Sequence, residues 1–270
     1  NIDINVASGV LTVNTEEDND IINVRAIRGA TTVNAGTGVD TVNVGDPAGT
    51  VDNIGALLMV NGDAGSDVLN VDDTGDGEAN TGTLTATTLT GLGMSADGIT
   101  YGTLEIVLIG LGSGGDIFNV QSTHATTSTT LNAGPGSDTI NVGSLAPDAG
   151  GTLNGIAGPL TVNGGGDSDT LNADDTGDTE TNTGTLTATT LTGLGMSLEG
   201  ITYGTLETLN IGLGSGNDAF NVQSTHAATS TTLDAGPGDD MINVGSLAPD
   251  VGGTVNDIGG PLTVNGQGGS

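Results

Sequence analysis

Residues 33–44 read Val33-Asn34-Ala35-Gly36-Thr37-Gly38-Val39-Asp40-Thr41-Val42-Asn43-Val44. Apolar and polar residues alternate before the glycines and again after the aspartate, and a period of two is typical of a β-strand with one face turned inward. Between the two strands lies a short glycine turn that ends in an acid. The same order recurs along the chain, for example at residues 131–142. The stretch therefore predicts an all-β array of short strands.

A longer repeat surrounds this unit. Asp72-Asp73-Thr74-Gly75-Asp76 returns as Asp174-Asp175-Thr176-Gly177-Asp178, and the match continues at a constant offset of 102 residues. A fixed internal period indicates a stacked repeat architecture. We therefore expect one continuous solenoid, made of N-terminal coils at 1–60, a first repeat at 61–162, a second repeat at 163–264 and the start of a further coil at 265–270. Because residues 265–270 resemble the turn at 163–168, and the first residues already form a strand pattern, we expect a segment of a longer protein.

The acids that end the turns set the expected number of coils. They are separated by 19 to 31 residues, and four intervals fill the 102-residue period. We expect four coils per repeat and about ten coils in all. The turn acids are Asp20, Asp40, Asp67, Asp97, Asp116, Asp138, Asp169, Glu199, Asp218 and Asp240.

The strands could pair as hairpins or wind as a coil. A series of hairpins leaves sheet edges that must pair elsewhere, whereas winding pairs each strand with the coils above and below it, at about 4.8 Å. We therefore expect a right-handed parallel β-helix or flattened β-roll, with the glycine turns aligned along one edge. The expected inward residues are Val42, Leu69, Phe118, Ile140, Leu171, Phe220 and Ile242, with Val24, Val44, Val71, Val120, Val142, Val222 and Val244 beside them.

Asparagine recurs between the inward residues of many strands. These side chains could stack as amide ladders along the axis. The period of two instead places them outside, as ordinary residues next to turns, and we favour this second interpretation. The positions are Asn23, Asn43, Asn70, Asn119, Asn141, Asn172, Asn221 and Asn243.

The composition excludes several classes of function. The formal net charge is −31, aromatic residues make up 1% of the chain, and Arg25 and Arg28 are the basic side chains. Such a chain offers neither a basic groove nor a stacking surface to nucleic acid. We expect no membrane insertion, because no stretch approaches the roughly 18 apolar residues that a spanning helix needs. There is no cysteine, so disulfides and thiolate metal sites are excluded, which is compatible with secretion by a route without oxidative folding.

The turn acids suggest a metal. Glycine permits positive φ and lets carbonyl oxygens converge, and aspartate adds a carboxylate, which together suit a hard cation such as calcium. Turns one coil apart lie within about 5 Å, so that a shared ion would fasten the coils together. Alternatively, each aspartate caps its own turn by accepting from nearby amides. The pairs Asp20–Asp40, Asp116–Asp138 and Asp218–Asp240 lie in the shortest coils, and the full set of expected ligands is Asp20, Asp40, Asp67, Asp116, Asp138, Asp169, Asp218 and Asp240.

Three turns resemble a known repeat. Residues 62–70, 133–141 and 235–243 resemble the hemolysin-type, or RTX, nonapeptide Gly-Gly-x-Gly-x-Asp-x-U-x, in which U is a large apolar residue. The longer repeat resembles those of very large bacterial surface proteins rich in β-strand repeats. The resemblance implies a secreted bacterial β-roll with calcium held by the turn aspartates and carbonyls. This chain departs from the family in having one such turn per coil, and residues 15–20 lack glycine.

Other polar residues need separate interpretations. Asp72, Asp73 and Asp76, with their copies 102 residues later, could form a second ion site or a solvated loop, and we favour the loop. His124 and His226 lie four coils apart, on the order of 19 Å, so they cannot share a metal and are expected at the surface. High charge with low hydrophobicity also leaves disorder of the metal-free chain open.

The function classes are an enzyme, a spacer and a filament. Polysaccharide lyases of the β-helix fold generally use Lys or Arg, and hydrolases need two carboxylates in a cleft, whereas every acid cluster here belongs to the repeat. We therefore expect no enzyme, but a structural segment of a secreted bacterial surface or extracellular-matrix protein, as a stalk, adhesin or filament. A polysaccharide-acting enzyme and a metal-free filament subunit are the alternatives. The expected partners are neighbouring repeats of the same chain or other copies joined end to end, and the acidic loops could bind a surface glycan.

Overall fold

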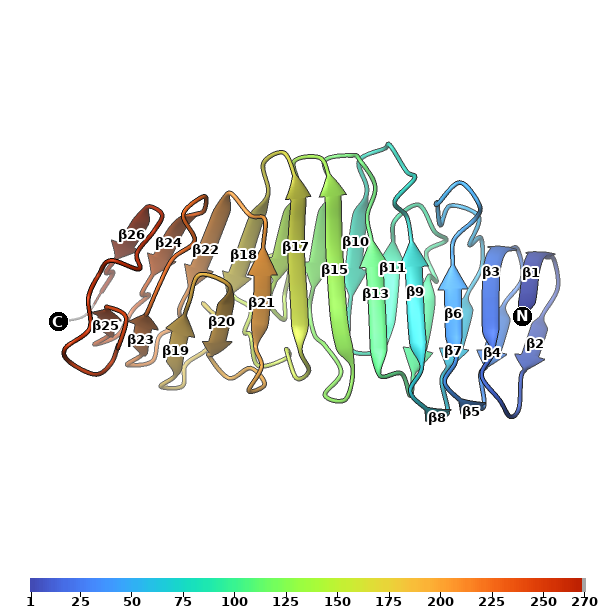
Figure 1. The fold of residues 1–270 in the computed structure, drawn as a ribbon, viewed down its shortest axis with the longest axis horizontal. Coiled ribbons are helices and arrows are strands. Elements are labelled where there is room, and N and C mark those ends of the chain that lie inside the picture. Colours follow the sequence, from blue (N-terminus) through green and yellow to red (C-terminus); the bar gives the residue numbers. More distant parts are fainter. Residues whose placement is uncertain (269–270) are drawn as a thin grey trace.

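The structure, a computed structural model, describes residues 1–268 and is all-β, with no helix among these residues. Two sheets of 12 strands each run side by side along a rod, and a small sheet joins β5 (Thr37–Gly38) to β8 (Ala64–Gly65). The N-terminus and the C-terminus lie at opposite ends of the rod (Figure 1).

Sheet A and sheet B are defined by their strands in spatial order. Sheet A contains β1 (Ile2–Ala7), β3 (Ile21–Ile27), β6 (Thr41–Val44), β9 (Val68–Asp72), β13 (Ile106–Gly110), β15 (Ser128–Pro135), β17 (Leu160–Gly166), β21 (Ile201–Gly204), β20 (Thr190–Gly193), β19 (Thr183–Leu186), β23 (Ala219–Val222) and β25 (Met241–Val244). Sheet B contains β2 (Leu11–Asn14), β4 (Thr31–Asn34), β7 (Leu58–Asn61), β12 (Ile99–Gly102), β11 (Thr88–Gly91), β10 (Thr81–Leu84), β14 (Ile117–Val120), β16 (Thr139–Val142), β18 (Thr170–Asp174), β22 (Thr208–Gly212), β24 (Ser230–Asp234) and β26 (Leu262–Asn265).

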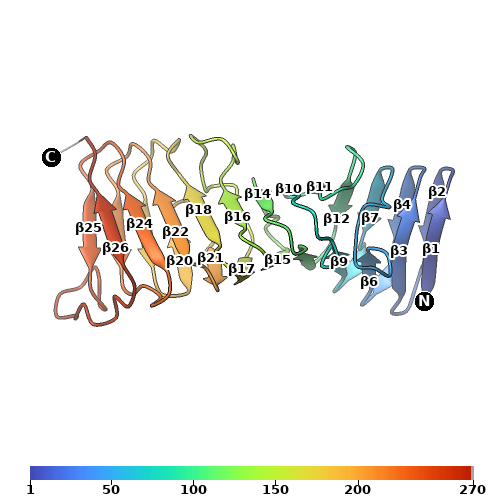
Figure 2. The ribbon, with the colours of Figure 1, turned by 90° about the horizontal axis from the view of Figure 1, so that it is seen from above.

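The chain winds as a parallel solenoid, as the sequence predicts. It crosses sheet A and sheet B in turn, and each strand pairs in parallel with the strand one coil away, as in β3 and β6, where Ile22 faces Val42 and Val24 faces Val44. The terminal coils lie at the two ends of the row of strands (Figure 2). Right-handed winding stays a prediction of the general rule for parallel connections.

The core is the predicted aliphatic ladder between the two sheets. The expected inward residues are buried throughout the rod, with Leu69, Phe118 and Leu171 fully covered. Two expectations fail at the last coil, where Ile242 is only partly buried and Val244 is exposed. These two side chains point inward as predicted, but no further described coil packs on them.

Two antiparallel excursions interrupt the winding. On sheet B the chain runs forward as β10, back as β11 and forward again as β12, so that β12 pairs with β7 and β10 pairs with β14. On sheet A, β19, β20 and β21 make the same excursion between β17 and β23. Gly82 lies opposite Phe118, and a Cβ on Gly82 would come within 2.6 Å of the phenyl ring. The glycine therefore makes room for the large ring inside the narrow core.

The prediction of four coils per 102-residue repeat is wrong. Equivalent strands lie on opposite sheets, since β7 belongs to sheet B and its counterpart β17 to sheet A. From β7 up to β17 the chain crosses the sheets seven times, which is three and a half turns. The sequence prediction counted a turn acid inside each excursion as a separate coil. Because of the half turn, the two excursions fall on different sheets, and both sheets reach 12 strands.

Candidate functional site

The predicted turn aspartates stack into hydrogen-bonded ladders. The backbone N–H of Asp20 donates to Oδ1 of Asp40 at 2.7 Å, and the N–H of Asp40 donates to Oδ1 of Asp67 at 2.9 Å. The same bond joins Asp116 to Asp138 (2.7 Å), Asp138 to Asp169 (2.9 Å) and Asp218 to Asp240 (2.9 Å). Each carboxylate thus bonds the amide of the preceding coil. The structure therefore brings together the three predicted pairs, in an arrangement that differs from capping of the acid's own turn.

The ladders lie on two edges of the rod, which corrects the prediction of a single edge. One edge precedes the strands of sheet A, and the other precedes the strands of sheet B. The half-integer repeat causes this division, because it moves equivalent turns to the opposite edge. Asp20, Asp40, Asp67, Asp218 and Asp240 belong to the sheet A edge, and Asp116, Asp138 and Asp169 to the sheet B edge.

Two glutamates that the sequence prediction missed complete the ladders. Oε2 of Glu105 accepts the N–H of Asp67 at 2.8 Å, and Oε2 of Glu207 accepts the N–H of Asp169 at 2.8 Å. Asp97 and Glu199, which were predicted as turn acids, lie instead between the second and third strands of the excursions. The signal for Glu105 was its place directly before the apolar strand that starts at Ile106.

Four ladder aspartates each carry one buried oxygen without a partner among the described residues. Asp40, Asp67, Asp138 and Asp169 are almost completely buried, and in each the Oδ2 atom has no hydrogen-bond donor. A buried, unpaired carboxylate oxygen is costly. Binding of a proton or a cation at each of these four oxygens would remove this cost.

Burial raises the pKa of the ladder aspartates. For Asp138, burial is the largest cause and raises the pKa to about 6, with the charges of Asp169 and Asp116 adding to it and the N–H of Asp116 opposing it. Burial also raises the pKa of Asp67, Asp116, Asp169 and Asp218. The ladders thus favour a neutralised state.

Glycines let the turns stack closely around these carboxylates. A Cβ on Gly62 would lie 2.8 Å from Oδ2 of Asp67, and a Cβ on Gly164 would lie 2.7 Å from Oδ2 of Asp169. Gly165 has a φ of +113°, and its Cβ would lie 2.1 Å from the carbonyl oxygen of Gly134 in the preceding coil. Any side chain at these positions would push the coils apart.

Two pairs of ladder aspartates have oxygens suited to calcium. The unpaired Oδ2 atoms of the Asp40–Asp67 and Asp138–Asp169 pairs fit a cation, because carboxylate oxygen is a preferred calcium ligand. Within residues 1–268, however, no group of three or more acidic, histidine or cysteine side chains is arranged to hold a metal. A cation at these pairs would therefore need backbone carbonyls and water as its remaining ligands.

A second set of acids is buried, which corrects the favoured prediction of a solvated loop. Oδ1 of Asp73 accepts the N–H of Val51 at 3.0 Å, and Oδ1 of Asp175 accepts the N–H of Leu153 at 2.8 Å. Burial raises the pKa of each to about 7, and in both the neighbouring acid, Asp76 or Asp178, raises it further. These carboxyls anchor the long loops to the coil beneath them.

One position next to this set differs between the repeats. Beside Asp178 of the second repeat, Nδ2 of Asn154 donates to Oδ2 of Asp178 at 3.2 Å. Beside Asp76 of the first repeat, Asp52 takes the place equivalent to Asn154, and the charge of Asp76 contributes, after burial, to a raised pKa of Asp52. An amide–carboxylate hydrogen bond is thus replaced by a pair of acids.

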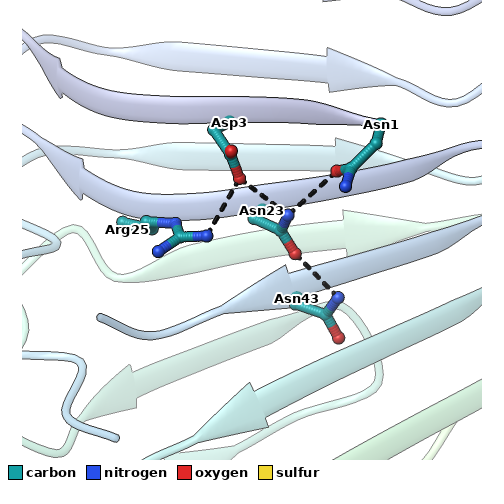
Figure 3. Close-up of polar contacts among 5 residues, drawn as sticks. All are labelled: Asn1, Asp3, Asn23, Arg25 and Asn43. Carbon is teal, nitrogen blue, oxygen red and sulfur yellow. Dashed lines mark hydrogen bonds and ion pairs between the residues drawn. The ribbon is translucent and has the colours of Figure 1, made fainter. Parts of the chain in front are cut away.

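The recurring asparagines form ladders, which the interpretation favoured from the sequence did not expect, and that interpretation is also wrong about burial at Asn119 and Asn221, which are buried, whereas the other six are partly buried. Nδ2 of Asn43 donates to Oδ1 of Asn23 at 3.0 Å, and Asn23 donates in turn to Asn1 and Asp3 (Figure 3). Arg25 forms an ion pair with Asp3 at 3.1 Å. Further rungs join Asn70 to Asn43, Asn141 to Asn119, Asn172 to Asn141, Asn210 to Asn172 and Asn243 to Asn221.

His124 and His226 are exposed, as expected. The described part of the chain has no helix of the length and apolarity needed to cross a membrane. Comparison with protein-family models, curated proteins and solved structures found no match. The residues and their geometry are therefore the basis for a functional assignment.

Proposed function

We propose that this chain is a structural repeat segment of a secreted bacterial surface or extracellular-matrix protein, in which the solenoid acts as an elongated spacer such as a stalk. The observation that carries the proposal is the continuity of both sheets from the first coil to the last. Repeats that stack along one axis lengthen the molecule with each copy, so the number of repeats sets its length. The bacterial and extracellular parts of the proposal are supported by the resemblance of the turns to the RTX repeat.

The proposal includes no catalytic role. Its support is that the buried acids recur with the scaffold, since Asp73 and Asp175 occupy equivalent positions and bond equivalent amides. Because each copy of the repeat carries the same buried acid with the same hydrogen bond, holding the repeat together is a sufficient role for it. Release of reducing ends from polysaccharides incubated with the purified chain would contradict this part of the proposal.

Small-angle X-ray scattering of the purified chain tests the spacer. Eleven strand spacings of about 4.8 Å give a distance of about 50 Å between the first and last strands of each sheet. The expected result is a rod whose cross-section is constant along its length. A compact, nearly spherical particle would overturn the proposal.

Calcium is proposed as the neutralising ion at the Asp40–Asp67 and Asp138–Asp169 pairs. The support is the set of buried Oδ2 atoms without a donor. An ion shared between coils would raise the melting temperature in proportion to the logarithm of its concentration above the dissociation constant. The proposed benefit is a rod that stiffens where calcium is plentiful, as it is outside cells.

Melting curves with millimolar calcium and with a chelator test this ion. The expected result is a calcium-dependent rise in melting temperature that Asp67→Asn and Asp169→Asn reduce. Asp250→Asn is the control, because it removes the same charge from an exposed loop. Equal responses of all three variants would show that calcium acts only by general screening of the acidic surface.

A further inference from the structure

The dipeptide Asn-Gly occurs four times in the chain, and one of the four asparagines lies outside a strand. The four are Asn61-Gly62, Asn154-Gly155, Asn163-Gly164 and Asn265-Gly266, and the one outside a strand is Asn154. Glycine has no side chain to shield its backbone nitrogen, which can therefore attack the carboxamide of a preceding asparagine. Whether the attack occurs depends on what holds the two groups in the folded chain.

Asn154 and Gly155 form an exposed turn in the middle of the rod. They are the central residues of the turn that Ile156 closes, by donating its N–H to the carbonyl oxygen of Leu153 at 2.9 Å. The side chain of Asn154 is exposed. The carbonyl oxygen of Gly155 accepts the N–H of Thr123 at 3.0 Å, whereas the N–H of Gly155 has no acceptor among the described residues. The nitrogen that would attack is therefore free of hydrogen bonds within residues 1–268.

Asn61-Gly62 is held by strand pairing and by a ladder of side chains. Asn61 ends β7 and pairs with Gly102 of β12. The N–H of Gly62 donates to the carbonyl oxygen of Gly102 at 3.1 Å. Nδ2 of Asn61 donates to Oδ1 of Asn34 at 2.7 Å. The reacting nitrogen and the carboxamide are thus both engaged in hydrogen bonds with neighbouring coils.

Asn163-Gly164 is held in the same way on sheet A. Asn163 lies within β17 and pairs with Gly204 of β21. Its Nδ2 donates to Oδ1 of Asn132 at 2.8 Å. Gly164 is buried, and a Cβ on it would lie 2.2 Å from the carbonyl oxygen of Thr205. This glycine is therefore packed closely against the neighbouring coil.

The carboxamide of Asn154 is the least constrained of these three. Its Nδ2 forms one hydrogen bond, to Oδ2 of Asp178 at 3.2 Å. Asp178 keeps two other donors when that bond is broken, Nδ2 of Asn182 at 3.0 Å and the N–H of Glu180 at 2.9 Å. The side chain of Asn154 can therefore turn toward Gly155 without opening a strand pair and without leaving a carboxylate unpaired.

We propose that Asn154 is a site of spontaneous deamidation in the folded chain, and that the fold protects Asn61 and Asn163 from the same reaction. The backbone nitrogen of Gly155 loses its proton to solvent and attacks Cγ of Asn154. A bond forms between this nitrogen and Cγ, which closes a cyclic imide. The bond between Cγ and Nδ2 breaks, and the nitrogen of the former amide takes up a proton and leaves as ammonia.

Water then opens the imide at one of its two carbonyl carbons. If the bond from the nitrogen to Cγ breaks, the product is aspartate. If the bond from the nitrogen to the backbone carbonyl carbon of residue 154 breaks, the product is isoaspartate, in which the chain continues through the former side chain. In both cases one water is consumed and one ammonia is released, and nothing is oxidised or reduced.

The first repeat shows the surroundings that an aspartate product would have. Asp52 occupies the place equivalent to Asn154, and its pKa is raised by burial and then by the charges of Asp76 and Asp46. An aspartate at position 154 likewise cannot donate to Asp178 and instead places a second acid beside it. Deamidation therefore weakens the attachment of the loop that carries Asp178.

An isoaspartate product changes the backbone as well as the charge. It lengthens the chain by one atom between residue 154 and Gly155, which displaces the carbonyl oxygen that Thr123 bonds. Either product adds one negative charge to a chain whose formal net charge is already −31. The reaction goes beyond the proposed function and does not depend on it. It gives the second repeat a change with age that the strand sites do not undergo.

Peptide mass spectrometry of the ageing chain tests the site. The purified full chain is kept folded at mildly alkaline pH, and samples are digested with pepsin, whose acidic conditions stop the reaction. The mass increase of an amide-to-acid exchange should accumulate at Asn154 at least about tenfold faster than at Asn61 or Asn163, a difference of about 1.4 kcal/mol in the barrier. Electron-transfer fragmentation distinguishes aspartate from isoaspartate. Equal rates at the three sites of the folded chain, or no conversion of Asn154, overturn the proposal.

The same chain in urea is the matched control. Unfolding removes the turn, the strand pairs and the asparagine ladders, while the dipeptide stays the same at Asn61, Asn154 and Asn163. The three rates should therefore converge in urea, with the two strand sites accelerating most. If Asn154 keeps the same lead over the other two in urea, the flanking sequence and not the fold causes the selectivity, and the proposed protection is wrong.

A variant of the first repeat tests whether the turn is sufficient. Ile54 closes the equivalent turn by donating its N–H to the carbonyl oxygen of Val51 at 2.9 Å. The double substitution Asp52→Asn with Asn53→Gly copies the reactive dipeptide into that turn, and position 52 should then deamidate at a rate comparable with Asn154. Asp52→Asn alone is the control, because the side chain of Asn53 shields the nitrogen and should keep the amide stable. A stable amide at position 52 in a double variant that circular dichroism shows to be folded would refute the role of the turn.

Discussion

At the scale of single residues, Asp73 and Asp175 show what burial in the solenoid does to a carboxyl group. Each is 1% exposed and accepts one backbone N–H, and burial raises the pKa of each to about 7. A carboxyl whose pKa is higher in the folded than in the unfolded chain favours folding while it is protonated. Its contribution is fully present below the unfolded pKa, near 4, and is lost as the pH rises through about 7.

We therefore predict that the free energy of unfolding in chelator falls between pH 4 and pH 7 and levels off above. Each unit of pKa shift corresponds to about 1.4 kcal/mol, so the loss per carboxyl is on the order of a few kcal/mol. Asp73→Asn and Asp175→Asn keep the acceptor for the amide but do not titrate, and each should flatten the profile. Urea unfolding across this pH range measures the effect, and a profile that rises with pH would contradict it.

The difference between Asp52 and Asn154 gives a second prediction. A Cβ on Gly93 would lie 1.8 Å from Oδ1 of Asp52, and a Cβ on Gly195 would lie 1.6 Å from Oδ1 of Asn154, so the two side chains occupy equivalent places. Asn154 donates to Asp178, whereas Asp52 faces Asp76 as a second acid.

Asp52→Asn should therefore stabilise the chain at pH 7 by about 1 kcal/mol, the usual gain for one hydrogen bond. The reverse change, Asn154→Asp, should destabilise it by a similar amount. Below pH 4, where the introduced or removed acid is protonated, both effects should shrink. Denaturant midpoints at pH 4 and pH 7 measure them, and effects of the same sign for both variants would refute the comparison.

At the scale of elements, the excursion depends on the absence of a side chain at Gly82. The ring of Phe118 fills the space that a Cβ would need, and Gly184 with Phe220 repeats this contact on the other sheet. Gly82→Ala should destabilise the chain by about 1–3 kcal/mol, the usual cost of overpacking. The control is Gly102→Ala, where nothing lies within 4 Å of the added carbon and the effect should be near zero. Thermal unfolding compares them, and equal melting temperatures would contradict the packing argument.

The strands and the core were predictable because they depend on local alternation. Val42, Leu69 and Phe118 follow a period of two, and that period alone decides which side faces inward. The excursions were not predictable, since β11 has the same alternation as a strand that continues the coil. Glu105 was missed for a related reason. Its role depends on which coil lies above Asp67, and the excursion places that coil 38 residues further along the chain.

The sequence also did not reveal on which sheet each repeat begins. An offset of 102 residues relates β7 to β17 in sequence but carries no information on whether the chain has made whole or half turns. Whether a repeat makes whole or half turns depends on how many of its strands lie within an excursion, where three strands cross one sheet without a turn of the coil. The division of the turn aspartates between two edges follows from it, which is why the expected single row of ion sites could not be corrected from the sequence.

At the scale of the whole molecule, the half turn balances the two sheets. From β7 to β16 the first repeat adds six strands to sheet B and three to sheet A, and from β17 to β25 the second repeat adds six to sheet A. A sheet with more strands is longer, so each repeat alone would bend the rod toward the shorter sheet. Two successive repeats bend it in opposite directions, and the sheets end with equal numbers of strands.

This balance predicts an alternation with repeat number. A chain extended by one further 102-residue copy should lengthen by about 20 Å, since a copy adds between three and six strands to each sheet at about 4.8 Å per strand. After β26 a third copy would place its excursion on sheet B and add five strands there and four to sheet A, so the three-repeat rod should curve toward sheet A, whereas a four-repeat rod should be straight overall. Electron microscopy of rods with two, three and four copies measures both length and curvature. Equal curvature at every repeat number would show that strand twist, and not the placement of the excursions on alternate sheets, sets the course of the rod.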